Sequence, residues 1–194
     1  MILVHAGNRV DAPDRPSPRF PASQVADVSA RVRLVLTSLA PAVVVSAPAA
    51  GADLIVLYAA QQLDIPVHII VPIDVDSFVD ASVADHGLDW VSRFHDVMTS
   101  ASDNVADVVV QLNLDPASAW WFAANGELID AADDRADPGE TVVALTIRPM
   151  GGEEPPSVTD DFARRAHDAG LLVLTLDPLA PNTTVTGTRR DGRG

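Results

Sequence analysis

Residues 51–72 read GADLIVLYAAQQLDIPVHIIVP, and this stretch decides the fold. Its first part, 51–63, follows a small-residue turn and has the length and composition of a strongly apolar helix. Its second part, 66–71, is a short β-branched run typical of a buried strand. A buried helix that leads directly into a buried strand is half of a β–α–β unit, so the stretch predicts an α/β fold.

Similar apolar runs recur on both sides of this stretch, with helical patterns between them. The strands are expected at 1–6, 42–47, 66–71, 105–112, 141–148 and 171–176, and the helices at 22–40, 51–63, 88–101, 116–136 and 158–169. Near-continuous apolar strands predict a mainly parallel, doubly wound sheet of about six strands, with helices on both faces. We expect one domain over 1–178, a flexible C-terminal tail over 179–194, and a strand order of the 3-2-1-4-5 type.

The composition excludes several classes of function. The 194 residues carry a formal net charge of -14, which argues against a nucleic-acid partner. There is no cysteine, and all 13 basic residues are arginine, which excludes thiolate sites, cysteine nucleophiles and lysine Schiff bases. The five histidines show no metal-ligand spacing, so neither a metal nor another cofactor is expected. No targeting or membrane-spanning segment is visible, which favours a cytoplasmic protein without a membrane partner.

The turn after the first strand is the first candidate for ligand binding. Ligands of doubly wound sheets bind beyond the carboxyl ends of the strands, where Gly7, Asn8 and Arg9 lie. A long proline-rich loop follows and carries Arg15 and Arg19. Guanidinium groups suit bidentate phosphate binding. The alternative is that these arginines form surface pairs with nearby aspartates.

The turn after the second strand is the second candidate. Ser46 offers a hydroxyl, and the small residues up to Gly51 would let a ligand approach the backbone and the free N–H groups of the next helix. The alternative is that Gly51 only permits a tight turn and Asp53 only caps the helix.

A third candidate is the predicted helix 116–136. Trp120 and Trp121 are adjacent, and neighbours on a helix point about 100° apart, so both cannot face the core. Trp121 is the candidate for lining a pocket, and the mid-helix Asn125 is a candidate hydrogen-bond partner or a solvent-facing residue. His5 and His68 lie inside predicted strands and are interpreted as core or edge residues.

The order of these pieces resembles the SLOG superfamily, the Rossmann-like group that includes DprA/SMF proteins and the Lonely-guy phosphoribohydrolases. The resemblance covers about residues 1–178 and lies in the Gly7-Asn8-Arg9 turn, in 51–72, in DVDSFVDASVADHGLDWVSRF (74–94) and in WWFAANGELID (120–130). It implies a Rossmann-like fold and a nucleotide-like ligand, with Gly7, Arg9, Ser46, Gly51 and Asn125 as contacts. The family's enzymatic PGGxGTxxE motif is absent, since residues 113–118 read NLDPAS.

The resulting hypothesis is a protein that binds or senses a nucleotide or nucleotide derivative, with Arg9 on the phosphate and Trp121 or Trp90 stacked on the base. One alternative is a nucleoside or nucleotide N-glycoside hydrolase, or a deoxyribosyltransferase, in which Glu127 and then Asp76 are the candidate catalytic carboxylates. For Asp76, helix capping is the competing interpretation. Another alternative is a non-catalytic acidic scaffold, and assembly into a homo-oligomer stays open.

Overall fold

The β-branched runs of the sequence form a seven-stranded sheet. The computed structural model describes residues 1–151, 156–180 and 185–188. Six strands are parallel, and the last is antiparallel to its neighbour. The strands are β1 (Ile2–Gly7), β2 (Val43–Ser46), β3 (Val67–Val71), β4 (Val108–Gln111), β5 (Val142–Ile147), β6 (Leu172–Leu176) and β7 (Thr186–Thr188).

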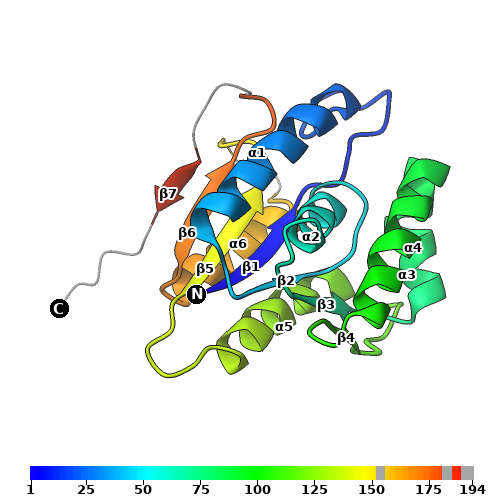
Figure 1. Cartoon of the computed structure of the whole chain (residues 1–194). Helices are drawn as coiled ribbons and strands as arrows, with labels where there is room; N and C mark the ends of the chain where they lie inside the picture. Colours follow the sequence, from blue (N-terminus) through cyan, green and yellow to red (C-terminus); the bar gives the residue numbers. More distant parts are fainter. Residues whose placement is uncertain (152–155, 181–184, 189–194) are drawn as a thin grey trace.

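Helices cover both faces of this sheet, which confirms the predicted doubly wound α/β class. Helices α1 and α2 lie in front of the sheet in Figure 1 and α6 lies behind it. Helix α5 packs against α6, β1 and β2, and so belongs to the same face as α6. The helices are α1 (Val25–Leu39), α2 (Ala52–Gln61), α3 (Val75–Ser82), α4 (Leu88–Asp103), α5 (Trp120–Asp134) and α6 (Val158–Asp168), with single 3-10 turns at Ala22–Gln24 and Ala84–His86.

The strand order is β4-β3-β2-β1-β5-β6-β7, and the expected 3-2-1-4-5 order is wrong at the fourth strand. β4 pairs with β3 at the edge of the sheet, and β5 takes the place beside β1. The valines of 108–110 suggested a buried strand, but burial alternates along β4 because an edge strand is covered less completely. All six residues of β5 are buried between β1 and β6.

The point where the chain changes direction across the sheet lies between β1 and β5. From β1 the chain proceeds through β2 and β3 to β4 on one side, and from β5 it proceeds to β6 on the other. The β1–β5 register runs without a break from Ile2 opposite Val142 to Gly7 opposite Ile147. The carboxyl ends of these two strands therefore leave the sheet together, which is where such folds open a crevice for a ligand.

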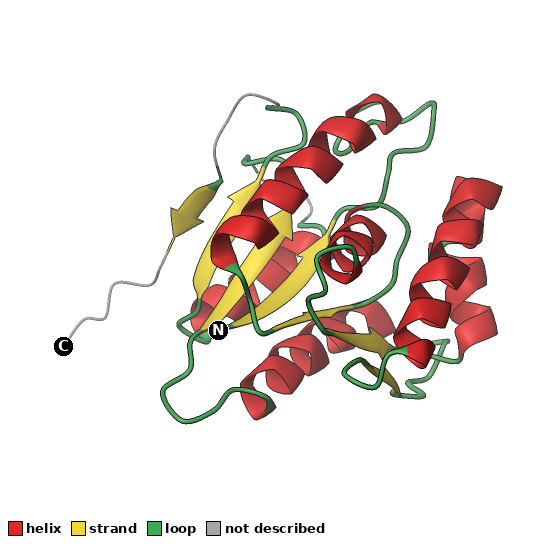
Figure 2. Cartoon of the chain, viewed as in Figure 1, coloured by secondary structure: helices red, strands yellow, loops and turns green. Residues whose placement is uncertain are grey.

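The long loop between β1 and α1, drawn green in Figure 2, is fixed by its own contacts. Val10 and Phe20 are buried in the core, and the Asp11 carboxylate accepts hydrogen bonds from the backbone N–H groups of Arg19 (2.7 Å) and Phe20 (2.8 Å). The Nε of Arg15 lies 3.4 Å from the same carboxylate. The loop is therefore an ordered structure that holds its first residues at the end of β1.

The stretch expected as a C-terminal tail contributes an element of its own. Within 179–194, Thr186–Thr188 form β7 and pair with β6, so the sheet has one strand beyond the six expected. Residues 181–184 and 189–194 lie outside the described part of the chain.

Candidate functional site

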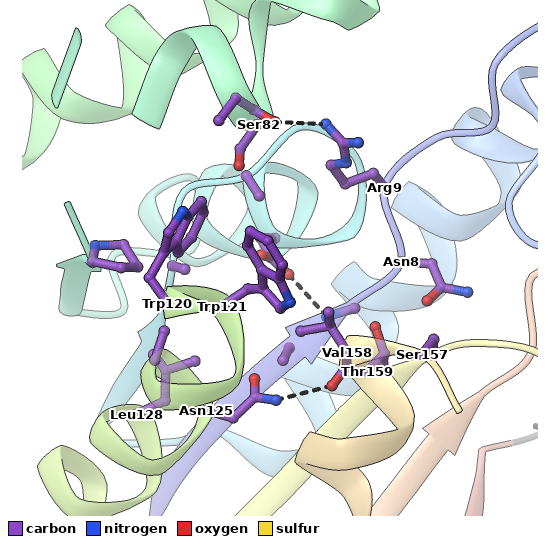
Figure 3. A pocket seen from close by; sticks show the side chains of 18 of the residues that line it. Asn8, Arg9, Ser82, Trp120, Trp121, Asn125, Leu128, Ser157, Val158 and Thr159 are labelled. Atoms are coloured by element: carbon purple, nitrogen blue, oxygen red, sulfur yellow. Dashed lines mark hydrogen bonds between the residues drawn. The ribbon is translucent and has the colours of Figure 1, made fainter. Parts of the chain in front are cut away.

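A cavity of about 360 Å³ lies beyond the carboxyl ends of β1, β2 and β3. Residues at and after the ends of these strands form one part of its lining, and residues of α3, the first half of α5 and the start of α6 form another. Figure 3 shows the rings of Trp120 and Trp121 on one side of the cavity and Asn8 and Arg9 on the other. The polar lining side chains are Asn8, Arg9, Arg19, Asp53, Ser82, Asn125, Ser157 and Thr159.

Six of the eight expected ligand-binding residues line this cavity. The structure brings together Gly7, Asn8, Arg9 and Arg19, from the end of β1 and the loop after it, and Trp121 and Asn125 from α5, two segments that are distant in the sequence. Ser46 does not line the cavity; it is buried, and its hydroxyl donates to the carbonyl of Ala47 at 3.1 Å.

Gly51, the other residue outside the lining, lies beneath the turn after β1. Its φ is +104°, and a Cβ there would lie 2.7 Å from the backbone nitrogen of Val10 and 2.9 Å from the carbonyl oxygen of Asn8. That carbonyl accepts a hydrogen bond from the N–H of Ala52 at 3.2 Å, so the β1 turn itself caps the start of α2. Gly51 therefore permits close packing of two backbone segments.

Arg9 crosses one side of the cavity and is held there by Ala81, which lines the cavity, and by Asp85, which does not. Its guanidinium donates to both carboxylate oxygens of Asp85 at 3.0 and 3.1 Å, and to the carbonyl of Ala81 at 3.2 Å. His86 contacts the same Asp85 carboxylate at 2.6 Å and the carbonyl of Val10 at 2.7 Å. The half-exposed ion pair fixes where the guanidinium lies and leaves it in contact with solvent.

The two tryptophans at the start of α5 both line the cavity. Trp120 is 7% exposed and packs on Phe78, with ring centroids 5.9 Å apart. Trp121 is 40% exposed and meets Trp120 edge to face at 5.4 Å. The buried ring therefore anchors the exposed one, which leaves an aromatic face available at the cavity.

Asn125 is buried and has a fixed orientation. Its amide nitrogen donates to the carbonyl of Val158 at 2.9 Å and to the carboxylate of Asp161 at 3.0 Å. Because both partners are pure acceptors, the side-chain NH₂ must face α6. The carbonyl oxygen of Asn125 is then the end of the amide that can accept from a ligand.

The first turn of α6 is fixed by a capping box between Ser157 and Asp160. The Ser157 hydroxyl accepts from the Asp160 N–H at 3.1 Å, and the Asp160 carboxylate accepts from the Ser157 N–H at 2.9 Å. This arrangement satisfies two end groups of the helix and places Val158 and Thr159 in the cavity lining.

The two carboxylates named for the enzyme alternative lie elsewhere. Glu127 is exposed on α5 and Asp76 is exposed on α3, and neither lines the cavity. Asp76 is not the cap of α3 either, since Asp74 takes that place and accepts from the N–H of Ser77 at 2.9 Å. Asp74, two residues earlier, caps the helix instead, and sequence spacing alone does not decide between the two aspartates.

The carboxylate that does line the cavity is Asp53, for which helix capping is the alternative interpretation of the sequence. It makes no cap hydrogen bond to α2; instead it accepts from the N–H of Gly7 at 2.9 Å and lies 3.3 Å from Nε2 of His5. Burial raises the pKa of Asp53 above its ordinary value, although the contacts with His5 and Gly7 act in the opposite direction. The sequence contains a signal for this contact: a histidine in the first strand, and an aspartate in the first turn of the helix that follows the second strand.

No group of three or more histidine, aspartate or glutamate side chains is arranged to hold a metal ion in the described part of the chain. Within those same residues, none of the helices combines the length and the apolar character needed to cross a membrane.

Comparison with known proteins does not assign this chain to a family. Neither the protein-family models nor the curated proteins that were compared with this chain match it.

Proposed function

We propose that the protein binds a nucleotide or nucleotide derivative in the cavity at the carboxyl ends of β1, β2 and β3. The observation that carries this proposal is the convergence of Arg9, Arg19, Trp121 and Asn125 on one cavity at the point where the chain changes direction. A volume of about 360 Å³ suits a small organic ligand. Guanidinium groups recognise phosphate, and an exposed indole stacks on a base.

Binding is favoured over the two alternatives by what lines the cavity. Asp53 is the one carboxylate among its described lining residues, so the two-carboxylate arrangement of most glycosidases is not found there. The hydrolase alternative is tested by incubating the protein with nucleoside monophosphates and measuring released base by chromatography. A scaffold with a degenerate site would have this edge filled with side chains, and the cavity supports a binding site instead.

The binding proposal is tested by thermal shift and calorimetry with AMP, ADP, ADP-ribose and cyclic dinucleotides. At least one should raise the melting temperature and bind with a micromolar dissociation constant. Trp121→Ala should weaken that binding about tenfold, since one stacked base contributes roughly 1–3 kcal/mol. Arg9→Ala should weaken the binding of phosphate-bearing ligands, whereas Arg33→Ala, on the exposed side of α1, should leave that binding unchanged. Failure of every compound to bind would refute the proposal.

A further inference from the structure

A buried histidine beside the cavity contacts an aspartate that lines it, and the binding proposal uses neither of them. His5 lies on β1 and is fully buried, and Asp53 lies in the first turn of α2 and lines the cavity. Their contact exists because Gly7 lets α2 approach β1: a Cβ on Gly7 would lie 2.3 Å from the Cβ of Ala52. The pair is therefore part of the packing that builds the site.

The hydrogen-bond partners of His5 determine where its protons lie. Nδ1 is 2.9 Å from the carbonyl oxygen of Leu145 on β5. A carbonyl only accepts, so Nδ1 carries a hydrogen. In a neutral ring Nε2 then presents a lone pair, and it faces Oδ1 of Asp53 at 3.3 Å with no other partner among the described residues.

Two lone pairs facing each other in a buried site would be unfavourable, so the contact calls for a proton. The proton can reside on the imidazole, giving an ion pair, or on the carboxyl group, giving two neutral groups. Oδ1 accepts the Gly7 N–H in either case. Both placements leave the pair with zero net charge, which avoids an isolated charge beside the cavity.

The charge of the pair matters because the other charged groups around the cavity are few. Arg9 and Arg19 are the remaining charged side chains in its described lining, and Asp85 pairs with Arg9 from outside. With the proton in place, the His5–Asp53 pair adds no net charge to the described lining. Without the proton, Asp53 would place a negative charge in the lining and repel an anion.

We propose that His5 and Asp53 share one proton beside the cavity, and that this proton makes the cavity selective for phosphate-bearing ligands. An anion in the cavity then stabilises the protonated pair, and the protonated pair favours the anion, because the coupling is reciprocal. The part that concerns ligands rests on the proposed function. The part that concerns the proton does not, because it is a property of the protein without ligand.

The first experiment measures the proton directly in the ligand-free protein. NMR on protein labelled with ¹⁵N-histidine and ¹³C-aspartate reports the protonation of both His5 ring nitrogens and of the Asp53 carboxyl group. At neutral pH we expect a hydrogen on Nδ1, with either a second one on Nε2 or a protonated Asp53. An ionised Asp53 facing a neutral ring with an unprotonated Nε2 would overturn the inference.

The second experiment compares ADP with adenosine, which has the same base and sugar but no charge. Measurements stay above about pH 7.5, where the terminal phosphate is largely ionised. ADP affinity should fall over the pH range in which the NMR experiment shows the shared proton to be lost, by at most tenfold per pH unit, which is the limit for one coupled proton. Adenosine affinity should change little.

Two variants and a comparison of outcomes complete the test. Asp53→Asn keeps an oxygen for the Gly7 N–H but carries no charge, so the pH dependence of ADP binding should disappear. Asp130→Asn, exposed on α5, should retain the pH dependence of ADP binding.

The possible outcomes separate this inference from the proposed function. If neither ADP nor adenosine binds, the NMR result still shows whether His5 and Asp53 share a proton. If ADP binds with no pH dependence and the proton is absent, the inference fails while the proposed function stands.

Discussion

His5 and His68 are both buried strand histidines, but their surroundings favour opposite protonation. In the register of the sheet, His5 lies opposite Ser46 while His68 lies opposite Val45, so the two rings project to opposite faces. His5 has hydrogen-bond acceptors on both sides, Leu145 and Asp53. Nδ1 of His5 therefore carries a proton, and a second proton lies either on Nε2 or on the carboxyl group of Asp53.

His68 has the reverse surroundings. The Nε–H of Arg135 donates to its Nδ1, so that nitrogen must be unprotonated. Burial, reinforced by the Arg135 charge, lowers the pKa of His68 from 6.5 to about 4. The comparison shows that the same side chain, buried in the same sheet, stays neutral or contributes to a proton-holding pair according to what the covering helix places beside it.

The largest expected effect comes from breaking the geometry on the His5 side. Gly51→Ala would force a Cβ to within 2.9 Å of three backbone atoms of Asn8, Arg9 and Val10, at a φ of +104°. Backbone cannot move aside as a side-chain end can, so we expect the free energy of unfolding to fall by about 4 kcal/mol. Chemical denaturation measures this loss.

Gly87→Ala is the matched control for that substitution. Gly87 has a similar φ of +97°, but nothing lies within 4 Å of the added Cβ. The control should therefore lose only the conformational cost, about 1–3 kcal/mol. Equal losses in the two variants would show that the close approach of α2 to the β1 turn is not what Gly51 provides.

The second prediction uses pH to probe the His68 side. The unfolded chain takes up a proton on this ring near pH 6.5, whereas the folded protein does so only near pH 4. The unfolded state therefore binds more protons in this window, and stability should fall as pH is lowered from about 6.5 to 4. We expect the contribution of His68 to this loss to be about 3 kcal/mol, since the two pKa values differ by about 2.5 and one pKa unit corresponds to about 1.4 kcal/mol.

Urea denaturation at a series of pH values measures this loss, with His68→Gln as the comparison. The variant has no group that titrates in the window, so its stability should change less between the two limits. If the wild-type protein and the variant lost the same stability on acidification, that result would contradict the assignment of a neutral, buried His68.

The smallest expected effect concerns the contribution of Arg135 to the same pKa. Removing the cation with Arg135→Gln should move the pKa of His68 part of the way back toward 6.5, because burial is the larger cause and remains. The acid-induced loss of stability should shrink by less than about 1 kcal/mol. An NMR titration of His68 measures the shift directly, and Arg33→Gln is a distant control. An unchanged or lower pKa of His68 in the Arg135→Gln variant would contradict this prediction.

The fold was largely predictable because local patterns report burial. The stretch 51–72 gave a helix and a strand close to those observed, Ala52–Gln61 and Val67–Val71. The place of β4 was not predictable, since three consecutive valines fit an edge strand as well as a central one. Which strands become neighbours depends on how the connecting helices pack, and no local pattern encodes that.

The candidate site was predictable in outline for a similar reason. Parallel strands bring their carboxyl ends to one edge, so Asn8, Arg9 and residues near Ser46 had to lie near each other. The sequence also placed Trp121 and Asn125 on a helix that follows a strand.

The sequence by itself determined the α/β class, the edge of the sheet at which the cavity lies, and the absence of cysteine and lysine chemistry. Only the tertiary structure decided that Asp53 meets His5 beside the cavity, while Glu127 and Asp76 face solvent. The physical reason is that periodicity and composition depend on neighbours along the chain. The charge state of a buried group depends on which donor or acceptor another segment brings within about 3 Å.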